Sequence, residues 1–484
     1  MTTGPELYTA LSAGDPAAPA LLTGDGEVVR YGALPARTDP WCRLLRHPGK
    51  ALVVCFAGRD LATALCYLAV LRLGHAVAML DAGIGAAARD RFLAAYRPDF
   101  LAWCPDDGRV ADPPPGYRHL GDSEGGSVFG RVDRPEWTPH PDLALVLSTS
   151  GSTGNPKAVR LSYRNIAGNS ASVAASLRIT GADRAASALP LHFGYGLSVL
   201  SSHLLAGGSV ALLPERPTGR AFWRRFAATG CTGFPGVAPT YEMLWPIVSE
   251  LDRVPTLRVM TSSGSRLRPD LVLRFAEHLR RRGGRLHMMY GQTESTSRMT
   301  CLDPEQLPDR VGSVGTAIPG GRLEIRADGE PAPDRCRGDI IYSGPNVMLG
   351  YAESRADLGL GDVARGALDT GDLGYLDGGF LYLTGRRKRI AKVLGLRLSL
   401  DDVERLFEDA GVTAAVDGGE AGVLLFTDGP VEPLERARLS VAAELGIPAS
   451  LLTIRPVPRL PRTPNGKLDY RALTEQAPQR ATTS

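Results

Sequence analysis

The sequence predicts an α/β fold followed by a smaller region of mostly antiparallel strands. Apolar runs of strand length alternate with segments of helical length, starting with a strand at 51–56, a helix at 61–71 and a strand at 76–80. Strands and helices that alternate in this way form parallel sheets with helices on their faces. After Arg322 short strands alternate with Gly and Asp turns as far as Leu383, which predicts an antiparallel sheet or barrel. The length of 484 residues exceeds what one hydrophobic core supports, so we expect two or more domains.

The same alternation places the remaining elements in order. Apolar runs at 143–147 and 158–161 flank a loop rich in Gly, Ser and Thr, so we expect a strand–loop–strand unit there. Next we expect a helix at 163–177, a strand at 209–213, a helix at 221–228, a strand at 257–261, a helix at 269–281 and a strand at 285–289. Beyond Gly385 a small α/β segment begins, with a helix at 403–409, a strand at 421–427, a helix at 434–445 and an extended segment at 451–456. The polar, Pro-rich stretch 105–115 predicts a surface loop.

The composition disfavours several classes of protein. Lys and Arg total 55 against 52 Asp and Glu, and this near balance gives no sign of a nucleic-acid-binding surface. The longest apolar stretch, 63–80, is interrupted by Arg72, Gly74 and His75, so it predicts a buried helix, turn and strand and not a membrane span. The seven cysteines include no CxxC pair, and the N-terminus lacks a signal-peptide pattern. We therefore expect a cytoplasmic protein, monomeric or homodimeric, with no membrane and no nucleic acid as partner.

A loop rich in small residues is a candidate phosphate clamp. It runs from Ser148 to Lys157 and reads Ser-Thr-Ser-Gly-Ser-Thr-Gly-Asn-Pro-Lys. Small residues let backbone N–H groups approach phosphate oxygens, hydroxyls add donors and the lysine adds charge. The segment is not a Walker A motif, because Pro156 separates the glycine from the lysine and no hydroxyl residue follows the lysine. A flexible Gly/Ser linker is the alternative interpretation. The candidate binding residues are Thr149, Ser150, Gly151, Ser152, Thr153, Gly154 and Lys157.

A second lysine, Lys467, lies in a similar loop near the C-terminus. The segment 461–468 reads Pro-Arg-Thr-Pro-Asn-Gly-Lys-Leu, which suggests a cation delivered to the same site from a separate lobe. Three more motifs lie between the two lysines: Tyr290-Gly291-Gln292-Thr293-Glu294, Thr370-Gly371-Asp372 and Gly385-Arg386-Arg387-Lys388. In this order the five motifs resemble those of the adenylate-forming superfamily, which includes acyl- and aryl-CoA ligases, adenylation domains of peptide synthetases and luciferases. The resemblance covers nearly the whole chain and implies an AMP-forming ligase.

The resemblance also implies a domain organisation. It predicts a large N-terminal domain of two mixed α/β subdomains plus a small barrel-like β subdomain, and a small mobile α+β C-terminal domain. We expect the first at 1–386 and the second, which carries the catalytic lysine, at 387–484. Lys388 is the expected hinge, although many relatives carry Asp there. In the superfamily the C-terminal domain rotates after adenylation, which withdraws the lysine and brings the loop around Gly395 to the site. No segment of carrier-protein size follows Lys467, so we expect a stand-alone enzyme.

Roles for ATP and Mg²⁺ follow from the same resemblance. Formation of an acyl-AMP joins two anions, a carboxylate and the α-phosphate, so the site needs cations and oriented donors. Lys157 and the loop hydroxyls would hold the β- and γ-phosphates, and Glu294 would hold Mg²⁺. Thr293 would bond the α-phosphate, and Lys467 would bridge it to the attacking carboxylate. The nucleoside would be bound by Tyr290 at adenine and by Asp372 with Arg386 at ribose, and the other residues implied at the nucleotide are Gly264, Ser265, Gly291 and Gln292.

Simpler explanations exist for several of these residues. Asp372 could be a turn residue, Glu294 could satisfy backbone donors at a helix start, and Lys467 could be merely exposed. We interpret Arg389, next to the expected hinge, as part of a solvated charge run. A binding module that has lost catalysis would show changes at the motif residues, and Lys157, Glu294, Asp372 and Lys467 are all intact. A hydrolase is disfavoured, since no Gly-x-Ser-x-Gly elbow precedes a suitable His/Asp pair.

The stretch 189–198 matches the segment that lines the acid pocket in the superfamily. Amino-acid-activating relatives place an Asp near here, but this chain has Phe193, Gly194 and Tyr195, which disfavours an α-amino acid. The two aromatic side chains, with space beside Gly194 and Gly196, imply an aryl or cyclic carboxylic acid. His192 is a candidate gate or catalytic base, and a structural role is the alternative. The remaining candidate pocket residues are Gly236, Gly264 and Gly395.

The acceptor is predicted from four further segments. Residues 195–200, 292–299, 344–347 and 385–395 look most like the coronafacate-ligase-like branch, which joins an acid to the amine of an amino acid. We therefore expect an amide-forming ligase of secondary metabolism, antibiotic biosynthesis included. A thioester with CoA or a carrier protein is the alternative, because those ligases share most of the motifs and Gly395 suits the passage of a pantetheine arm. Activation of another small oxyanion is a remote alternative.

Overall fold

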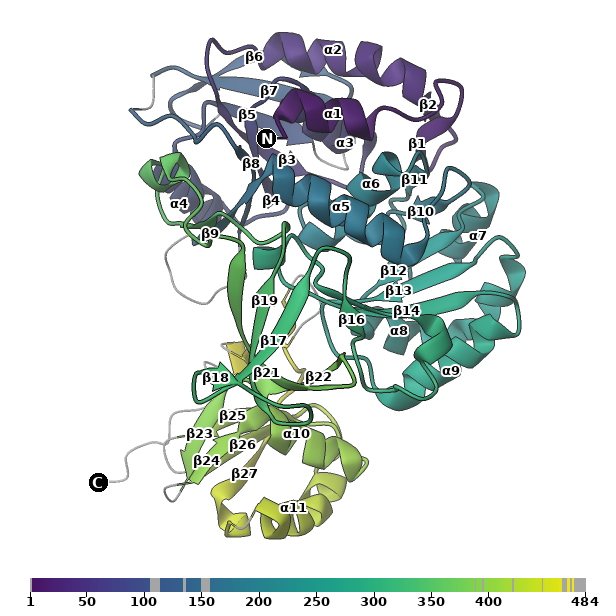
Figure 1. Cartoon of the computed structure of the whole chain (residues 1–484), viewed down its shortest axis with the longest axis vertical. Coiled ribbons are helices and arrows are strands. Elements are labelled where there is room, and N and C mark those ends of the chain that lie inside the picture. Colours follow the sequence, from purple (N-terminus) through teal and green to yellow (C-terminus); the bar gives the residue numbers. More distant parts are fainter. Residues whose placement is uncertain are drawn as a thin grey trace. The chain divides into compact units, whose positions relative to one another are not determined.

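The chain forms two compact units in the computed structural model (Figure 1). The described residues are 2–104, 114–133, 136–148, 157–387, 389–393, 396–419, 422–445, 447–463, 468–470 and 472–473. The first unit comprises Met1–Arg322 with Tyr342–Leu368, and the second comprises Leu323–Ile341 with Asp369–Ser484. The boundary between residues 386 and 387 stays a prediction, since the expected hinge residue Lys388 lies outside the described residues.

An eight-stranded sheet forms one half of the first unit, in the order β20-β9-β8-β4-β3-β5-β7-β6. The central strands β8 (Leu143–Ser148), β4 (Ala76–Asp81), β3 (Leu52–Ala57) and β5 (Phe100–Cys104) are parallel and almost wholly buried. The outer strands β20 (Gly350–Ala352), β9 (Ala158–Ser162), β7 (Gly126–Arg131) and β6 (Tyr117–Ser123) are antiparallel to their neighbours. Since β8 and β9 pair directly, the predicted strand–loop–strand unit is confirmed in its two strands.

A nine-stranded sheet forms the other half, in the order β16-β15-β14-β13-β12-β10-β11-β1-β2. The strands β14 (Arg285–Tyr290), β13 (Val259–Ser262), β12 (Gly233–Gly236), β10 (Arg184–Ala186), β11 (Ser209–Leu212) and β1 (Pro19–Thr23) are parallel. The edges are antiparallel and consist of β2 (Val28–Arg30), β15 (Thr300–Leu302) and β16 (Thr316–Ala317). Two mostly parallel sheets therefore match the expected pair of mixed α/β subdomains.

Helices cover these sheets. They are α1 (Gly4–Leu11), α2 (Leu34–Leu44), α3 (Leu61–Arg72), α4 (Ala86–Tyr96), α5 (Tyr163–Leu177), α6 (Gly194–Leu205), α7 (Arg220–Ala228), α8 (Ala238–Leu244) and α9 (Pro269–Arg280). Short 3₁₀ turns are η1 (Tyr31–Ala33), η2 (Trp245–Arg253), η3 (Thr293–Ser295), η4 (Pro304–Gln306) and η5 (Ala356–Gly359). Helix α3 is apolar on every face because it packs between β3 and β4 on one side and α1 and α2 on the other.

Helices α5 and α6 connect the two sheets. Helix α5 packs on β8 and β9, α6 packs on β10 and β11, and the two helices lie side by side (Figure 1). Helix α5 begins at a capping box, in which Ser162 Oγ accepts from the Asn165 N–H and Asn165 Oδ1 accepts from the Ser162 N–H. It ends at Arg178, which adopts the left-handed conformation with φ of 56°. This layer fixes the N-terminus of α6 between the sheets, where the predicted acid-pocket segment begins.

Three of the seven cysteines lie together in the core of the first unit. All seven are free thiols. Cys55 on β3, Cys66 on α3 and Cys104 on β5 meet in the core and are fully buried. Free cysteine in such a position packs as a small hydrophobe.

The second unit contains a five-stranded sheet and a small α+β segment. The sheet has the order β18-β17-β19-β21-β22, with β18 (Glu330–Pro331), β17 (Arg322–Ala327), β19 (Gly338–Ser343), β21 (Ala367–Asp377) and β22 (Phe380–Arg386). The α+β segment contains the hairpin β23 (Ile390–Val393) and β24 (Leu396–Ser399), the helices α10 (Leu400–Asp409) and α11 (Val431–Leu445), the 3₁₀ turn η6 (Ala449–Leu451) and a sheet of β25 (Ala415–Gly419), β26 (Gly422–Thr427) and β27 (Leu452–Pro456). Val403, Phe407 and Val441 bury the two helices against this sheet.

These elements confirm the predicted fold class. The parallel sheets, the β-rich region after Arg322 and the small C-terminal α+β segment all occur where they are expected. The predicted surface loop at 105–115 lies mostly outside the described residues. None of the described helices is long and apolar enough to cross a membrane.

Candidate active site

A strained turn follows β14 and carries the Tyr290–Glu294 motif. Gly291 is required there, because a Cβ atom on it would lie 2.1 Å from the carbonyl oxygen of Ser297. Thr296 and Ser297 adopt positive φ angles of 53° and 93°, which are unfavourable for residues other than glycine. Such strain persists only where the surroundings hold it, and it is typical of functional sites.

Asn346 holds this turn in place. Its Nδ2 donates to the carbonyl oxygens of Ser295 and Arg298, both at 2.8 Å, and its own carbonyl accepts from Thr296 Oγ1 at 2.7 Å. The Met348 N–H donates to the Glu294 carbonyl at 2.8 Å. The segment around Asn346 therefore fixes the backbone that presents Thr293 and Glu294.

Several predicted nucleotide-site residues meet at one edge of the nine-stranded sheet. The parallel strands β12, β13 and β14 are neighbours, so Gly236, Gly264 and Tyr290–Glu294 all lie at or just after strand ends at the same edge. Ligands of open α/β sheets bind at this edge. Gly264 has a φ of 85°, which favours glycine. The neighbouring Ser265 Oγ accepts from the Ala238 N–H at 3.1 Å, so at least one contact of Ser265 supports the start of α8.

Lys157 and Glu294 both contact one tyrosine, Tyr351. Tyr351 Oη donates to Glu294 Oε1 at 2.9 Å, and Lys157 Nζ lies 3.6 Å from the centroid of the Tyr351 ring. Tyr351 belongs to β20, whose pairing with β9 places it beside Val159, two residues after Lys157. Burial and the Glu294 carboxylate raise the pKa of Tyr351 well above its ordinary value, so its hydroxyl stays a donor at neutral pH. The arrangement joins a cation suited to phosphate and a carboxylate suited to Mg²⁺.

The predicted acid-pocket segment is the N-terminal end of α6. Tyr195 Oη lies 2.7 Å from Thr261 Oγ1 on β13, and the His192 ring packs edge-on against Phe193 with centroids 4.3 Å apart. His192 Nε2 lies 3.9 Å from Asp81 Oδ2 at the end of β4, so a protonated His192 has a carboxylate partner.

Glycines in this region make room for neighbouring protein atoms. A Cβ at Gly196 would lie 2.3 Å from the Pro190 carbonyl oxygen, and one at Gly236 would lie 2.8 Å from the Tyr241 ring. At Gly194 a Cβ would meet Leu147 at 3.3 Å and Ser297 at 3.8 Å. Close packing against protein atoms is therefore enough to require glycine at 196 and 236, and no substrate is needed to explain it. Gly194 lies between β8 and the Glu294 turn.

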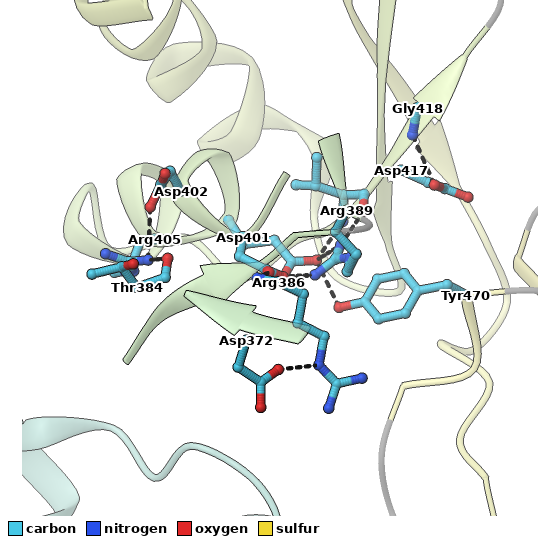
Figure 2. Close-up of polar contacts among 12 residues, drawn as sticks. Asp372, Thr384, Arg386, Arg389, Asp401, Asp402, Arg405, Asp417, Gly418 and Tyr470 are labelled. Atoms are coloured by element: carbon cyan, nitrogen blue, oxygen red, sulfur yellow. Dashed lines mark hydrogen bonds and ion pairs between the residues drawn. The ribbon is translucent and has the colours of Figure 1, made fainter. Parts of the chain in front are cut away.

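In the second unit, the predicted ribose-binding residues pair with each other. Asp372 on β21 is opposite Arg386 on β22, and Asp372 Oδ1 lies 3.1 Å from Arg386 Nε (Figure 2). Gly371 has a φ of 70°, and the Asp372 N–H donates to Thr370 Oγ1 at 3.1 Å. The turn and the ion pair orient the carboxylate so that it can accept bonds from two neighbouring hydroxyls.

Arg389, just after the predicted hinge, belongs to a network and not to a solvated charge run. Its guanidinium pairs with Asp401 and Glu404, and it lies 3.9 Å from the ring centroid of Tyr470, whose hydroxyl donates to Glu404 Oε1 at 2.8 Å (Figure 2). The Arg386 N–H also donates to Asp401, at 2.6 Å. The sequence-based expectation for Arg389 is wrong, because the carboxylates that pair with it come from α10 and cannot be seen in the local charge pattern.

Arg389→Ala is expected to destabilise the second unit by about 1–3 kcal/mol, because it leaves two partly buried carboxylates without their cation. Urea unfolding of the full chain measures this change. Arg436→Ala is the matched control, since Arg436 is exposed on α11 and its loss should change stability by less than about 0.5 kcal/mol. Equal stability of the two variants would contradict a structural role for the Arg389 network.

Some predicted residues cannot be placed. The phosphate-loop residues Thr149, Ser150, Gly151, Ser152, Thr153 and Gly154 lie outside the described residues, as do Lys388, Gly395 and Lys467. Ser148 and Lys157, the first and last residues of the loop, are described. Tyr351 is a functional candidate that the sequence did not reveal, because its partners are remote along the chain. Asn346 falls in the segment 344–347 noted above, but its contacts with the Glu294 turn could not be predicted. The only local signal is an aromatic residue directly after Gly350, which is weak.

The chain belongs to the AMP-binding enzyme family, whose model matches residues 10–352. It is 32% identical over 360 residues to a sulfoacetate–CoA ligase of Cupriavidus necator, covering 70% of this chain and 68% of the relative. It is 30% identical over 365 residues to a 2-succinylbenzoate–CoA ligase of Bacillus velezensis, covering 72% and 71%. The family membership confirms the resemblance to adenylate-forming enzymes.

Solved structures agree on the fold. The o-succinylbenzoate CoA synthetase of Bacillus subtilis with its acyl-adenylate superimposes with a TM-score of 0.78 at 23% identity, over 99% of both chains. The same enzyme with ATP and magnesium ion gives a TM-score of 0.74 at 24% identity, over 96% of this chain and 98% of that one. The chain is an AMP-forming acid ligase that uses ATP and Mg²⁺.

Proposed function

We propose that the enzyme activates a carboxylic acid as an acyl-AMP and passes the acyl group to the thiol of CoA. The acid oxygen attacks the α-phosphate of ATP and expels pyrophosphate; the thiol then attacks the acyl carbon and expels AMP. The named relatives are acid–CoA ligases, and this favours the thioester alternative over the amide that the sequence suggested. An amine acceptor, and with it a role in secondary metabolism, is the second candidate.

The observation that carries this proposal is the Lys157–Tyr351–Glu294 arrangement. Lys157 Nζ would neutralise the β- and γ-phosphates, together with the loop hydroxyls. Glu294 would hold Mg²⁺, which supplies further neutralisation of the triphosphate when it is bound. Tyr351 contacts both groups, because its ring faces the lysine and its hydroxyl is bonded to the carboxylate.

Residues of the second unit would serve the nucleoside and the reacting groups. Asp372 would accept bonds from the ribose hydroxyls, and its ion pair with Arg386 would keep the carboxylate oriented. Lys467 would bridge the attacking carboxylate and the α-phosphate. These roles are carried over from the family motifs and stay predictions.

The acid would bind beside the N-terminus of α6. Phe193 and Tyr195 provide aromatic surface there, and His192 with Asp81 can place a proton donor at its rim. This supports an aryl or cyclic acid. The acids named for the two relatives, sulfoacetate and 2-succinylbenzoate, each carry two acidic groups.

The test is pyrophosphate release from ATP and Mg²⁺ with a panel of aryl, cyclic and aliphatic acids. Each acid is assayed alone, with CoA and with mixed amino acids, and the products are identified by mass. A CoA adduct is the expected product, while an amide would establish the second candidate. If no acid releases pyrophosphate under any condition, the proposed acid activation is wrong.

Lys388→Pro is expected to slow thioester formation by about 10²-fold while acid-dependent adenylation is largely kept, because proline restricts φ and so impairs a hinge that must change its backbone angles. Single-turnover assays of the two half-reactions measure this. Equal losses in both halves would argue against a hinge at Lys388.

A further inference from the structure

Arg298 is a fully buried cation with an incomplete set of partners. It follows the Glu294 turn and is 0% exposed. Its Nη1 donates to Ser198 Oγ at 2.6 Å, and its Cζ lies 4.2 Å from the centroid of the Tyr195 ring. Its Nε is buried and has no hydrogen-bond partner among the described residues. Within that part of the chain, no Asp or Glu lies within ion-pair distance of it.

Arg160 shows what a satisfied buried arginine looks like in the same unit. It is also 0% exposed. Its guanidinium donates to the carbonyl oxygens of Tyr351 and Leu349, at 3.1 and 3.3 Å, and to those of Leu360 and Gly361. Arg160 therefore joins β9 to the chain around β20 and has a complete structural explanation. Arg298 therefore differs from Arg160 in its hydrogen-bond partners and not in its burial.

A buried charge whose hydrogen-bonding groups are not all satisfied is costly, and such groups cluster at functional sites. Burial lowers the pKa of Arg298 from its ordinary value, but an arginine remains charged. The side chain is also held in place: Ser198 Oγ donates a hydrogen bond to Asn169 Oδ1 at 2.9 Å, and Asn169 Nδ2 donates to the Arg298 carbonyl at 3.1 Å. The guanidinium is thus oriented but not neutralised.

The surroundings of Arg298 place it at the predicted acid pocket. Its partners Tyr195 and Ser198 lie on α6, one turn apart, and Tyr195 is an expected wall of that pocket. A cavity of about 30 Å³ lies next to it; Arg298, Thr261, Val199 and Ser202 line it, and so do the titratable residues Asp183 and His203. A water needs roughly 10–15 Å³, so the space accepts a small polar group.

We propose that Arg298 binds a second anionic group of the acid substrate, a carboxylate or sulfonate, while the first carboxylate is adenylated. This inference rests on the proposed acid activation and names its substrate class: doubly anionic acids. The second anion supplies the missing counter-charge and can accept the bond that Nε lacks. The Tyr195 ring shields the ion pair from water. A singly charged analogue leaves Arg298 unpaired and binds worse for that reason.

The experiment compares matched pairs of acids that differ in one anionic group: 2-succinylbenzoate with 4-oxo-4-phenylbutanoate, and homophthalate with phenylacetate. Pyrophosphate release by the wild-type chain is expected to favour the doubly charged acid by roughly 10²-fold in kcat/KM. In Arg298→Met this preference should vanish or reverse, and the Tm of the unliganded variant should not fall. Arg160→Met, the matched control, should lower the Tm and keep the preference.

A second readout does not depend on turnover. The doubly charged acid should raise the Tm of the wild-type chain more than its singly charged partner does, and Arg298→Met should abolish the difference. Arg298→Lys, which keeps the charge, should retain part of it. Pyrophosphate release without a preference for the doubly charged acids would overturn the role of Arg298 and leave the acid-ligase function standing. The same ratio in wild type and in both Arg298 variants would also overturn it. No release with any acid would overturn the proposed function itself.

Discussion

Lys467→Ala is expected to lower acid-dependent pyrophosphate release by about 10²–10³-fold, because it removes a charge that stabilises two anions as they meet. A pre-formed acyl-AMP should still be converted to product. In that step the thiol attacks the acyl carbon, so no carboxylate has to approach a phosphate. Both steps can be followed separately, the first as pyrophosphate release and the second as consumption of synthetic acyl-AMP with CoA.

The chain around Lys467 is anchored on both sides, so the substitution should leave the fold intact. Arg462 forms an antiparallel bridge with Leu468, and Tyr470 is bonded to Glu404. Arg459→Ala is the control, because it removes an exposed positive charge from the same segment. Full adenylation by Lys467→Ala, or an equal loss in the control, would contradict the catalytic role.

Glu294→Gln is expected to lower adenylation by about 10²–10³-fold and to raise the Mg²⁺ concentration needed for half-maximal rate, because it removes the carboxylate charge that would hold the metal. Glutamine can still accept the bond from Tyr351 Oη, so the local geometry is preserved. The rate of pyrophosphate release measured over a range of Mg²⁺ concentrations tests this.

Tyr351→Phe separates the charge of Glu294 from its hydrogen bond. It keeps the carboxylate and the aromatic face under Lys157, so its effect should be at most about tenfold. A loss in Tyr351→Phe as large as that in Glu294→Gln, with unchanged Mg²⁺ dependence in both, would show that Glu294 does not act through a metal.

The sequence predicts elements well where local signals and burial agree. Helix α5 has the predicted bounds 163–177, since a capping box starts it and a left-handed residue ends it. The helices α1, α2, α4, α6 and α8 were not predicted from the sequence. In α6, Gly194 and Gly196 weaken the intrinsic helix preference, and packing between the two sheets overrides it.

The residues of the site also differ in how well the sequence predicts them. The Tyr290–Glu294 motif is contiguous, so sequence alone can find it. Tyr351, Asn346 and Arg298 matter through contacts with residues far away in the chain, and one sequence gives no sign of such pairs. For Arg389 the local sequence misleads. Its run of neighbouring charges predicts an exposed side chain, but the carboxylates that pair with it lie on α10.

The most direct test of an acyl-AMP intermediate is the transfer of oxygen from the acid to AMP. The acid that gives the fastest pyrophosphate release is labelled with ¹⁸O in both carboxylate oxygens and converted in the presence of CoA. If the acid attacks the α-phosphate and the acceptor then cleaves the acyl C–O bond, one labelled oxygen must leave with AMP. Mass spectrometry should therefore find AMP that carries one ¹⁸O. Unlabelled AMP, or label in orthophosphate, would contradict adenylate formation.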